Sequence, residues 1–166
     1  LASAGPARVR QLTLLTTERG ILTALRIEEL EAAAPLEVFA YADIDIPDNG
    51  AGDDTGLIDA SIDAAVIEDP GTGQQVALLH DGRGALETVK EINALASDVR
   101  GRTLSGQDEL TSGDGAAAMR WSFPSVSSPV LVRGATVLVE GSSDAERVGR
   151  RFFSVGAALG AVHQRP

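Results

Sequence analysis

The sequence predicts an α+β fold in which a largely antiparallel sheet of about six or seven strands is covered by two amphipathic helices. Three observations support this prediction. Apolar residues alternate strictly over 36–46, further short alternating segments are separated by turns that contain Gly and Pro, and apolar residues recur at helical spacing over 85–99 and 143–163. The 166 residues suit one α+β domain over 1–166, because no internal repeat and no long linker divides them.

The first two strands are expected in residues 8–27, on either side of the turn TERG, in which Gly20 is free to adopt a positive φ. One face of the second strand is formed by Ile21, Thr23, Leu25 and Ile27. One or two helical turns are expected over 28–34, which are rich in helix formers and end before Pro35.

The clearest strand is predicted over 36–46. Its apolar face consists of Leu36, Val38, Ala40, Ala42, Ile44 and Ile46. Its other face carries Glu37, Phe39, Tyr41, Asp43 and Asp45. A period of two over eleven residues indicates a half-buried strand with one dry face and one face that is acidic and aromatic.

Residues 57–68 are ambiguous, and we expect a helical turn followed by a strand. A type II turn is predicted at 69–73, with Pro70 and Gly71 at its centre, and a returning strand over 74–80. An amphipathic helix is then expected over 85–99. Its apolar stripe consists of Leu86, Val89, Ile92, Ala96 and Val99, with Leu95 at the border.

The polar, Gly-rich residues 101–115 are expected to form a mobile excursion or a functional lid. A strand is predicted over 116–123, with one face formed by Ala117, Met119, Trp121 and Phe123. Residues 129–141 fit either one long strand with a bulge at Gly134 or a tight hairpin.

A capping box formed by Ser143 and Glu146 predicts the start of the terminal helix over 143–163. Its apolar seam consists of Val148, Phe152, Val155, Leu159 and Val162. Its interior glycines are Gly149, Gly156 and Gly160. Each glycine costs roughly 1 kcal/mol relative to alanine. We therefore expect another backbone to approach closely, either the sheet underneath or the same helix of a second copy in a homodimer.

Composition excludes several classes of function. The formal net charge of −10 argues against nucleic acid and anionic membranes as partners, and no apolar run approaches the ~20 residues of a membrane span. The absence of cysteine excludes disulfides, thiolate catalysis and cysteine-based zinc sites. No cofactor is predicted. The two histidines, His80 and His163, are each expected at a strand end or on the surface.

The source and the compartment are only weakly indicated. Lys90 is the single lysine among fourteen cationic residues, and this arginine bias is typical of a GC-rich, bacterial genome. The opening LASAGPAR fits a processed or excised terminus. A cytoplasmic location is slightly favoured, with export after signal cleavage as the alternative.

The acidic stretch DIDIPDNGAGDDTG at 43–56 is the candidate metal site. Its candidate ligands are Asp43, Asp45, Asp48, Asp53 and Asp54. Neither register of the EF-hand ligand spacing fits, because glycines or a proline occupy ligand positions. An acidic turn between two packed elements is the preferred interpretation. The alternative function that this cluster suggests is a divalent-metal-dependent hydrolase.

The predicted strand order, with its closing strand and helix, resembles small sensor folds of the PAS or GAF type, with profilin-like layering as a further possibility. This resemblance implies a non-catalytic domain that binds a protein partner or a small molecule, as a homodimer through the terminal helix. The residues assigned to ligand or partner binding are Phe39, Tyr41, Trp121, Gly156 and Gly160.

Overall fold

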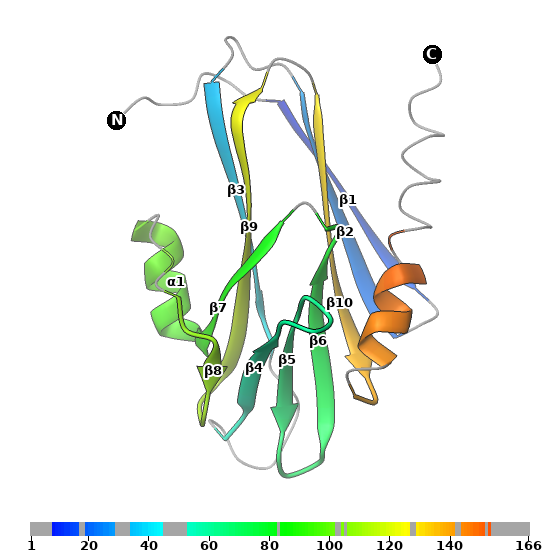
Figure 1. Ribbon diagram of the computed structural model, residues 1–166, viewed down its shortest axis with the longest axis vertical. Coiled ribbons are helices and arrows are strands. Elements are labelled where there is room, and N and C mark those ends of the chain that lie inside the picture. Colours follow the sequence, from blue (N-terminus) through cyan, green and yellow to red (C-terminus); the bar gives the residue numbers. More distant parts are fainter. Residues whose placement is uncertain are drawn as a thin grey trace.

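The computed structural model describes residues 8–16, 19–28, 34–44, 53–82, 84–101, 104, 106–126, 129–141, 144–151 and 153. The strands in this part of the chain are β1 (Arg8–Thr16), β2 (Gly20–Glu28), β3 (Ala34–Asp43), β4 (Thr55–Asp59), β5 (Ala64–Asp69), β6 (Gln74–His80), β7 (Ala85–Glu91), β8 (Glu109–Leu110), β9 (Gly115–Val126) and β10 (Val130–Val139). The helices are α1 (Ile92–Gly101) and a second helix that includes residues 144–151 (Figure 1). Neither helix has the length and apolar character needed to cross a membrane.

The strands form two antiparallel sheets. The larger sheet has seven strands in the order β1-β2-β10-β6-β5-β4-β8, and the smaller has three in the order β3-β9-β7. The prediction of a largely antiparallel sheet with two helices is therefore confirmed. The prediction that six or seven strands form a single sheet is corrected, because among the named strands β3, β7 and β9 pair with one another and form a second sheet. PAS, GAF and profilin-like layering would place one sheet at the centre, and here there are two.

The main core lies between the two sheets. Its buried members are Ile44, Ala65, Ile67, Leu78, Val89, Leu110, Ala117, Met119, Trp121 and Val132. The alternation predicted for β3 and β9 holds, since Val38, Ala40 and Ala42 pack against this cluster from β3. Burying each large apolar side chain stabilises the fold by roughly 1.5–3 kcal/mol.

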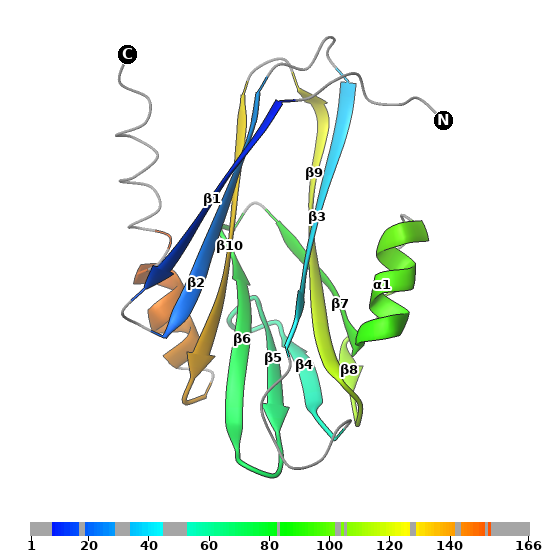
Figure 2. The ribbon, with the colours of Figure 1, turned by 180° about the vertical axis from the view of Figure 1, so that it is seen from behind.

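Each helix covers the outer face of one sheet (Figures 1 and 2). From α1, Leu95 packs on Ala116 and Ala118 of the smaller sheet. From the second helix, Ala145 and Val148 pack on the larger sheet.

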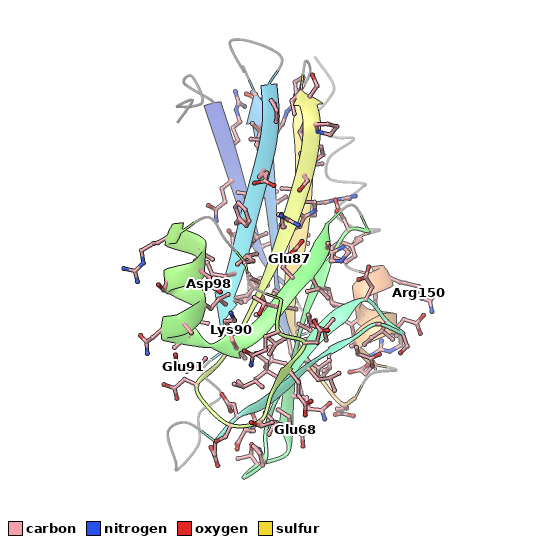
Figure 3. The ribbon with its side chains drawn as sticks, turned by 60° about the vertical axis from the view of Figure 1, so that its left-hand side comes forward. Glu68, Glu87, Lys90, Glu91, Asp98 and Arg150 are labelled. Atoms are coloured by element: carbon pink, nitrogen blue, oxygen red, sulfur yellow. The ribbon has the colours of Figure 1, made fainter. Side chains whose placement is uncertain are left out.

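The only lysine of the chain lies beneath α1. Lys90 Nζ is 2.7 Å from Asp98 Oδ2, and its side chain is 9% exposed. Figure 3 shows the two side chains together between β7 and α1.

Helix α1 begins seven residues later than predicted, because residues 85–91 form β7. The register of β7 against β9 shifts between Leu86 and Thr88. This bulge adds one residue, so Leu86 and Val89, three positions apart, both face the inter-sheet core. Two apolar residues three positions apart therefore have the spacing of one face of a helix, although they lie in a bulged strand. The helix starts where the Glu91 carboxylate accepts a hydrogen bond from the Ala94 N–H at 3.1 Å.

Two predicted turns are also corrected. The expected helical turn at the start of 57–68 is wrong, because β4 and β5 form a hairpin whose turn contains Asp63 at φ 53°. The type II turn at 69–73 is wrong as well, since the positive φ falls at Gly73 and not at Gly71. The Asp69 carboxylate accepts hydrogen bonds from the amides of residues 71 and 72 and fixes a different turn.

One open alternative is resolved, and a second segment is described more closely. Residues 129–141 contain one continuous strand, β10, whose register runs unbroken through Gly134 against both β2 and β6. The expected excursion over 101–115 includes a short strand, β8, that pairs with β4. The helical turns expected over 28–34 fall on residues that lie mostly outside the described ranges, where β2 ends at Glu28 and β3 begins at Ala34.

The terminal helix follows the prediction as far as it is described. Val148 is buried against the larger sheet, and Phe153 packs on the same cluster. A Cβ at Gly149 would lie 3.1 Å from Leu79 Cδ1, so at this position the sheet underneath is the close neighbour. Ser143 of the capping box, and the part of the helix that would contain Gly156 and Gly160, lie outside the described residues.

The two sides of the sandwich differ. On one side the segment around β8 joins the sheets, because Val89 N–H donates to Gln107 O at 2.8 Å and Ile58 N–H donates to Asp108 O at 2.8 Å. A Cβ at Gly56 would lie 2.6 Å from Val89 Cγ1, so glycine lets the sheets approach closely there. On the other side lie the two edge strands β1 and β3, which face the viewer in Figure 2.

Candidate functional site

A cleft of about 340 Å³ lies between the sheets on the side of the two edge strands. Strands β2 and β10 line it from the larger sheet, and β3 and β9 line it from the smaller one. Its volume falls at the lower end of the range of roughly 300–1,000 Å³ that is typical of ligand pockets.

Small side chains leave this space open. Ala40 and Ala42 of β3 face Thr23 of β2 and Gly134 of β10. At Gly134 the Met119 side chain occupies the space that a side chain would need, because a Cβ there would lie 2.5 Å from Met119 Cε. The chain also has few large side chains to fill the gap, since aromatic residues make up only 4% of it.

The floor of the cleft is apolar and buried. It is formed by Leu78, Met119, Trp121 and Val132, which all belong to the inter-sheet core. Trp121 is 1% exposed, and its indole N–H donates to Asp81 Oδ1 at 3.2 Å. The polar atom of this ring is therefore satisfied, and the ring offers an apolar surface to the cleft.

The mouth of the cleft combines polar groups with exposed apolar side chains. Polar side-chain atoms come from Gln11, Thr23 and Thr136. Ile21 is 44% exposed, although it is large. An apolar floor with a few polar groups at the entrance is the usual composition of a small-molecule site.

A buried polar cluster fixes the crossover from β6 to β7 beside the cleft. Asp81 Oδ2 lies 3.4 Å from Arg133 Nε, and the two side chains are 1% and 15% exposed. Arg133 Nη1 in turn donates to Phe153 O at 3.2 Å. One carboxylate thus connects Trp121 of the smaller sheet to the larger sheet and to the terminal helix.

His80 lies at the end of β6, as predicted, but its side chain is buried. Its Nδ1 accepts a hydrogen bond from Gly82 N–H at 3.1 Å. Its Nε2 is 3.2 Å from Asp63 Oδ2, yet no partner is aligned for a hydrogen bond with this buried atom. Because Nδ1 accepts the Gly82 hydrogen bond, Nε2 is the ring nitrogen that faces the Asp63 carboxylate.

Three carboxylates approach one another where the acidic stretch enters β4. Ligand oxygens of Asp53, Asp54 and Asp69 lie within 4.8 Å of one another. Asp54 Oδ2 accepts a hydrogen bond from Gly115 N–H at 3.1 Å, so it supports the contact between the sheets. Hydrogen bonds from the Thr72 hydroxyl and then from backbone amides hold the pKa of Asp69 below its ordinary value.

The residues predicted from sequence separate into three groups. Trp121 lines the cleft, and Phe39 and Tyr41 border it from the edge strand β3, with their side chains on the face opposite to that of Ala40 and Ala42. Asp43 is exposed at the end of β3, and Asp53 and Asp54 meet Asp69, which the sequence reasoning did not include. The predicted residues outside the described ranges are Asp45, Asp48, Gly156, Gly160 and His163.

The sequence reasoning missed the contribution of β2 and β10 to the cleft. The alternation of Ile21, Thr23 and Leu25 identified one face of a strand, but not what that face meets. For Gly134 the sequence predicts a bulge or a hairpin, whereas in the structure this glycine makes room for Met119. The small residues Ala40 and Ala42 on an otherwise apolar face were the available signal for an unfilled space.

A larger hollow of about 770 Å³ lies where β10 ends and the second helix begins. Its charged lining residues are of both signs, namely Arg19, Glu140, Asp144 and Arg147. Arg147 already pairs with Asp144. This mixture favours no single ligand chemistry, so the inter-sheet cleft is the better candidate.

No protein family, no curated protein and no solved structure matches the chain. Its function must therefore be argued from the geometry and chemistry of the cleft.

Proposed function

We propose that the chain is a non-catalytic binding domain that takes a small apolar molecule into the cleft between its two sheets. The observation that carries this proposal is an open space of about 340 Å³ with a buried apolar floor and polar groups only at its mouth. Buried floor residues contribute the hydrophobic free energy of binding, while the polar rim orients the ligand.

The exposed apolar side chains at the mouth support the same proposal. Leu15 is 85% exposed and lies opposite Ile21 in the register of β1 and β2. Ile21 lines the cleft, and Leu15 extends the same sheet face as exposed apolar surface. Side chains of this size are costly to leave in water, and clusters of them mark binding sites more often than ordinary surface.

The test uses a neutral fluorescent probe, N-phenyl-1-naphthylamine, whose emission rises in apolar surroundings. Binding should saturate at one probe per chain. Thr23→Phe fills the cleft and should weaken binding at least about tenfold, a loss of about 1.4 kcal/mol.

Thr13→Phe is the matched control. Thr13 pairs with Thr23 across β1 and β2 and points to the same face, but it is exposed and does not line the cleft. Circular dichroism checks that both variants keep their strands. The proposal fails if the native chain shows no saturable binding, or if the two variants bind the probe equally well.

The alternative of a divalent-metal-dependent hydrolase has one supporting observation, the approach of Asp53, Asp54 and Asp69. Calcium or magnesium bound there would raise the melting temperature, since a ligand at 100 times its Kd adds about 2.7 kcal/mol. Asp53→Asn should remove that rise. An unchanged melting temperature with both ions would exclude this alternative.

A further inference from the structure

We infer that the ligand of the cleft is an uncharged single-chain amphiphile of the alcohol or ester class, and not a fatty-acid carboxylate. This inference rests on the proposed function and specifies its ligand. It follows from three features of the cleft, namely its uncharged lining, the placement of its polar atoms and its volume.

Among the residues that the structure describes, none of those that line the cleft is charged. The arginine side chains described on the neighbouring strands lie on the opposite sheet faces, and each takes part in an ion pair. They are Arg10, Arg26, Arg120 and Arg133. A carboxylate in the cleft would lose water without gaining a cation, in a chain whose net charge is already −10.

The polar atoms of the lining are placed for one neutral polar end. Gln11 is exposed at the mouth, and Thr23 and Thr136 are half-buried just inside it. Amide and hydroxyl groups can donate to or accept from an alcohol or an ester. The floor is apolar, because the only side-chain N–H of Trp121 is bound to Asp81. The chain of the ligand therefore points inward and its polar end outward.

The volume sets the length of the ligand. A space of about 340 Å³ holds about eleven non-hydrogen atoms if each takes roughly the 30 Å³ of a liquid water molecule. Decan-1-ol has this size. A second alkyl chain would not fit.

The experiment compares decan-1-ol with decanoate at pH 8, below the concentrations at which either aggregates. Trp121 is the only tryptophan of the chain and lies in the floor, so its emission reports occupancy directly. Decan-1-ol should bind at least about tenfold more tightly than decanoate. Binding of decanoate within twofold of decan-1-ol would overturn the inference while leaving the proposed function intact. Binding of neither compound would count against both.

A charge added at the mouth should reverse the preference. Gln11→Arg places a cation beside the polar end and should tighten decanoate binding at least about fivefold, with decan-1-ol little changed. Thr13→Arg is the control, because Thr13 is exposed two residues away on the same face but does not line the cleft. If Gln11→Arg fails to improve decanoate binding, or if Thr13→Arg improves it equally, the polar end does not lie at this mouth and the inference is wrong.

Discussion

Replacing Ala40 by leucine is expected to stabilise the fold and to close the cleft. Ala40 is half-buried and lines the space between the sheets. Leucine adds three carbon atoms, which at roughly 30 Å³ each fit within the available 340 Å³. Burying them contributes roughly 0.8 kcal/mol each, and ordering the side chain costs about 0.5–1 kcal/mol. The net gain is about 1.5 kcal/mol.

Urea denaturation followed by circular dichroism measures this gain. A thermal melt should show a midpoint raised by about 3–6 °C, given a shift of roughly 2–4 °C per kcal/mol for a domain of this size. Binding of the neutral probe should weaken in the same variant. Greater stability with lost binding is the expected trade-off when a functional cavity is filled.

Ala65→Leu is the matched comparison, because Ala65 belongs to the same core but is 0% exposed and does not line the cleft. Overpacking there should cost about 1–3 kcal/mol. If Ala40→Leu destabilises the fold as much as Ala65→Leu does, the cleft is not free space, and the reasoning behind the proposed site is refuted.

Three further substitutions test the buried polar groups. Asp81→Ala should cost about 3–5 kcal/mol in urea denaturation, because it leaves the buried Trp121 N–H and the partly buried Arg133 without their carboxylate. A decrease in the free energy of unfolding of less than about 0.5 kcal/mol would show that water replaces the Asp81 carboxylate as hydrogen-bond partner. Asp69→Asn should lower the melting temperature at pH 7, because hydroxyl and amide hydrogen bonds lower the pKa of Asp69. The stability from a depressed pKa is present above the ordinary value of 3.8 and is lost as the pH falls through the folded-state value, so the difference from the native chain should shrink below pH 3.8. Lys90→Met should cost about 1–3 kcal/mol in urea denaturation, because it removes the ammonium group that pairs with the half-buried Asp98 beneath α1, and a neutral result would show that the methionine packs equally well.

Local patterns predicted the strands whose polarity alternates without interruption. The first hairpin, β3 and β9 were found in this way, because a period of two depends only on neighbouring residues. Strand β7 was missed because its bulge places Leu86 and Val89 on one face at a spacing of three. The division into two sheets could not be predicted, since it depends on pairing between distant segments such as β7 and β9.

The candidate site shows the same limit. Phe39, Tyr41 and Trp121 were predicted as binding residues because they are aromatic, and all three lie at the cleft. Thr23 and Gly134 became members of the site only through the pairing of β2 with β10, which are more than a hundred residues apart in the chain. A cavity forms where the side chains of two opposing sheets do not fill the space between them. The sequence of one strand does not show which strand lies opposite, so it does not predict the cavity.

The position of β10 affects the order in which the molecule can assemble. This strand lies between β2 and β6, and in the described part of the chain it provides the only ladder between the first hairpin and the rest of the larger sheet. During synthesis the hairpin therefore waits for residues 130–139 to leave the ribosome before it can dock. Until β10 has been synthesised, β2 and β6 each have an unpaired edge that can pair with another chain. The nascent chain is therefore exposed to aggregation until β10 fills the place between them.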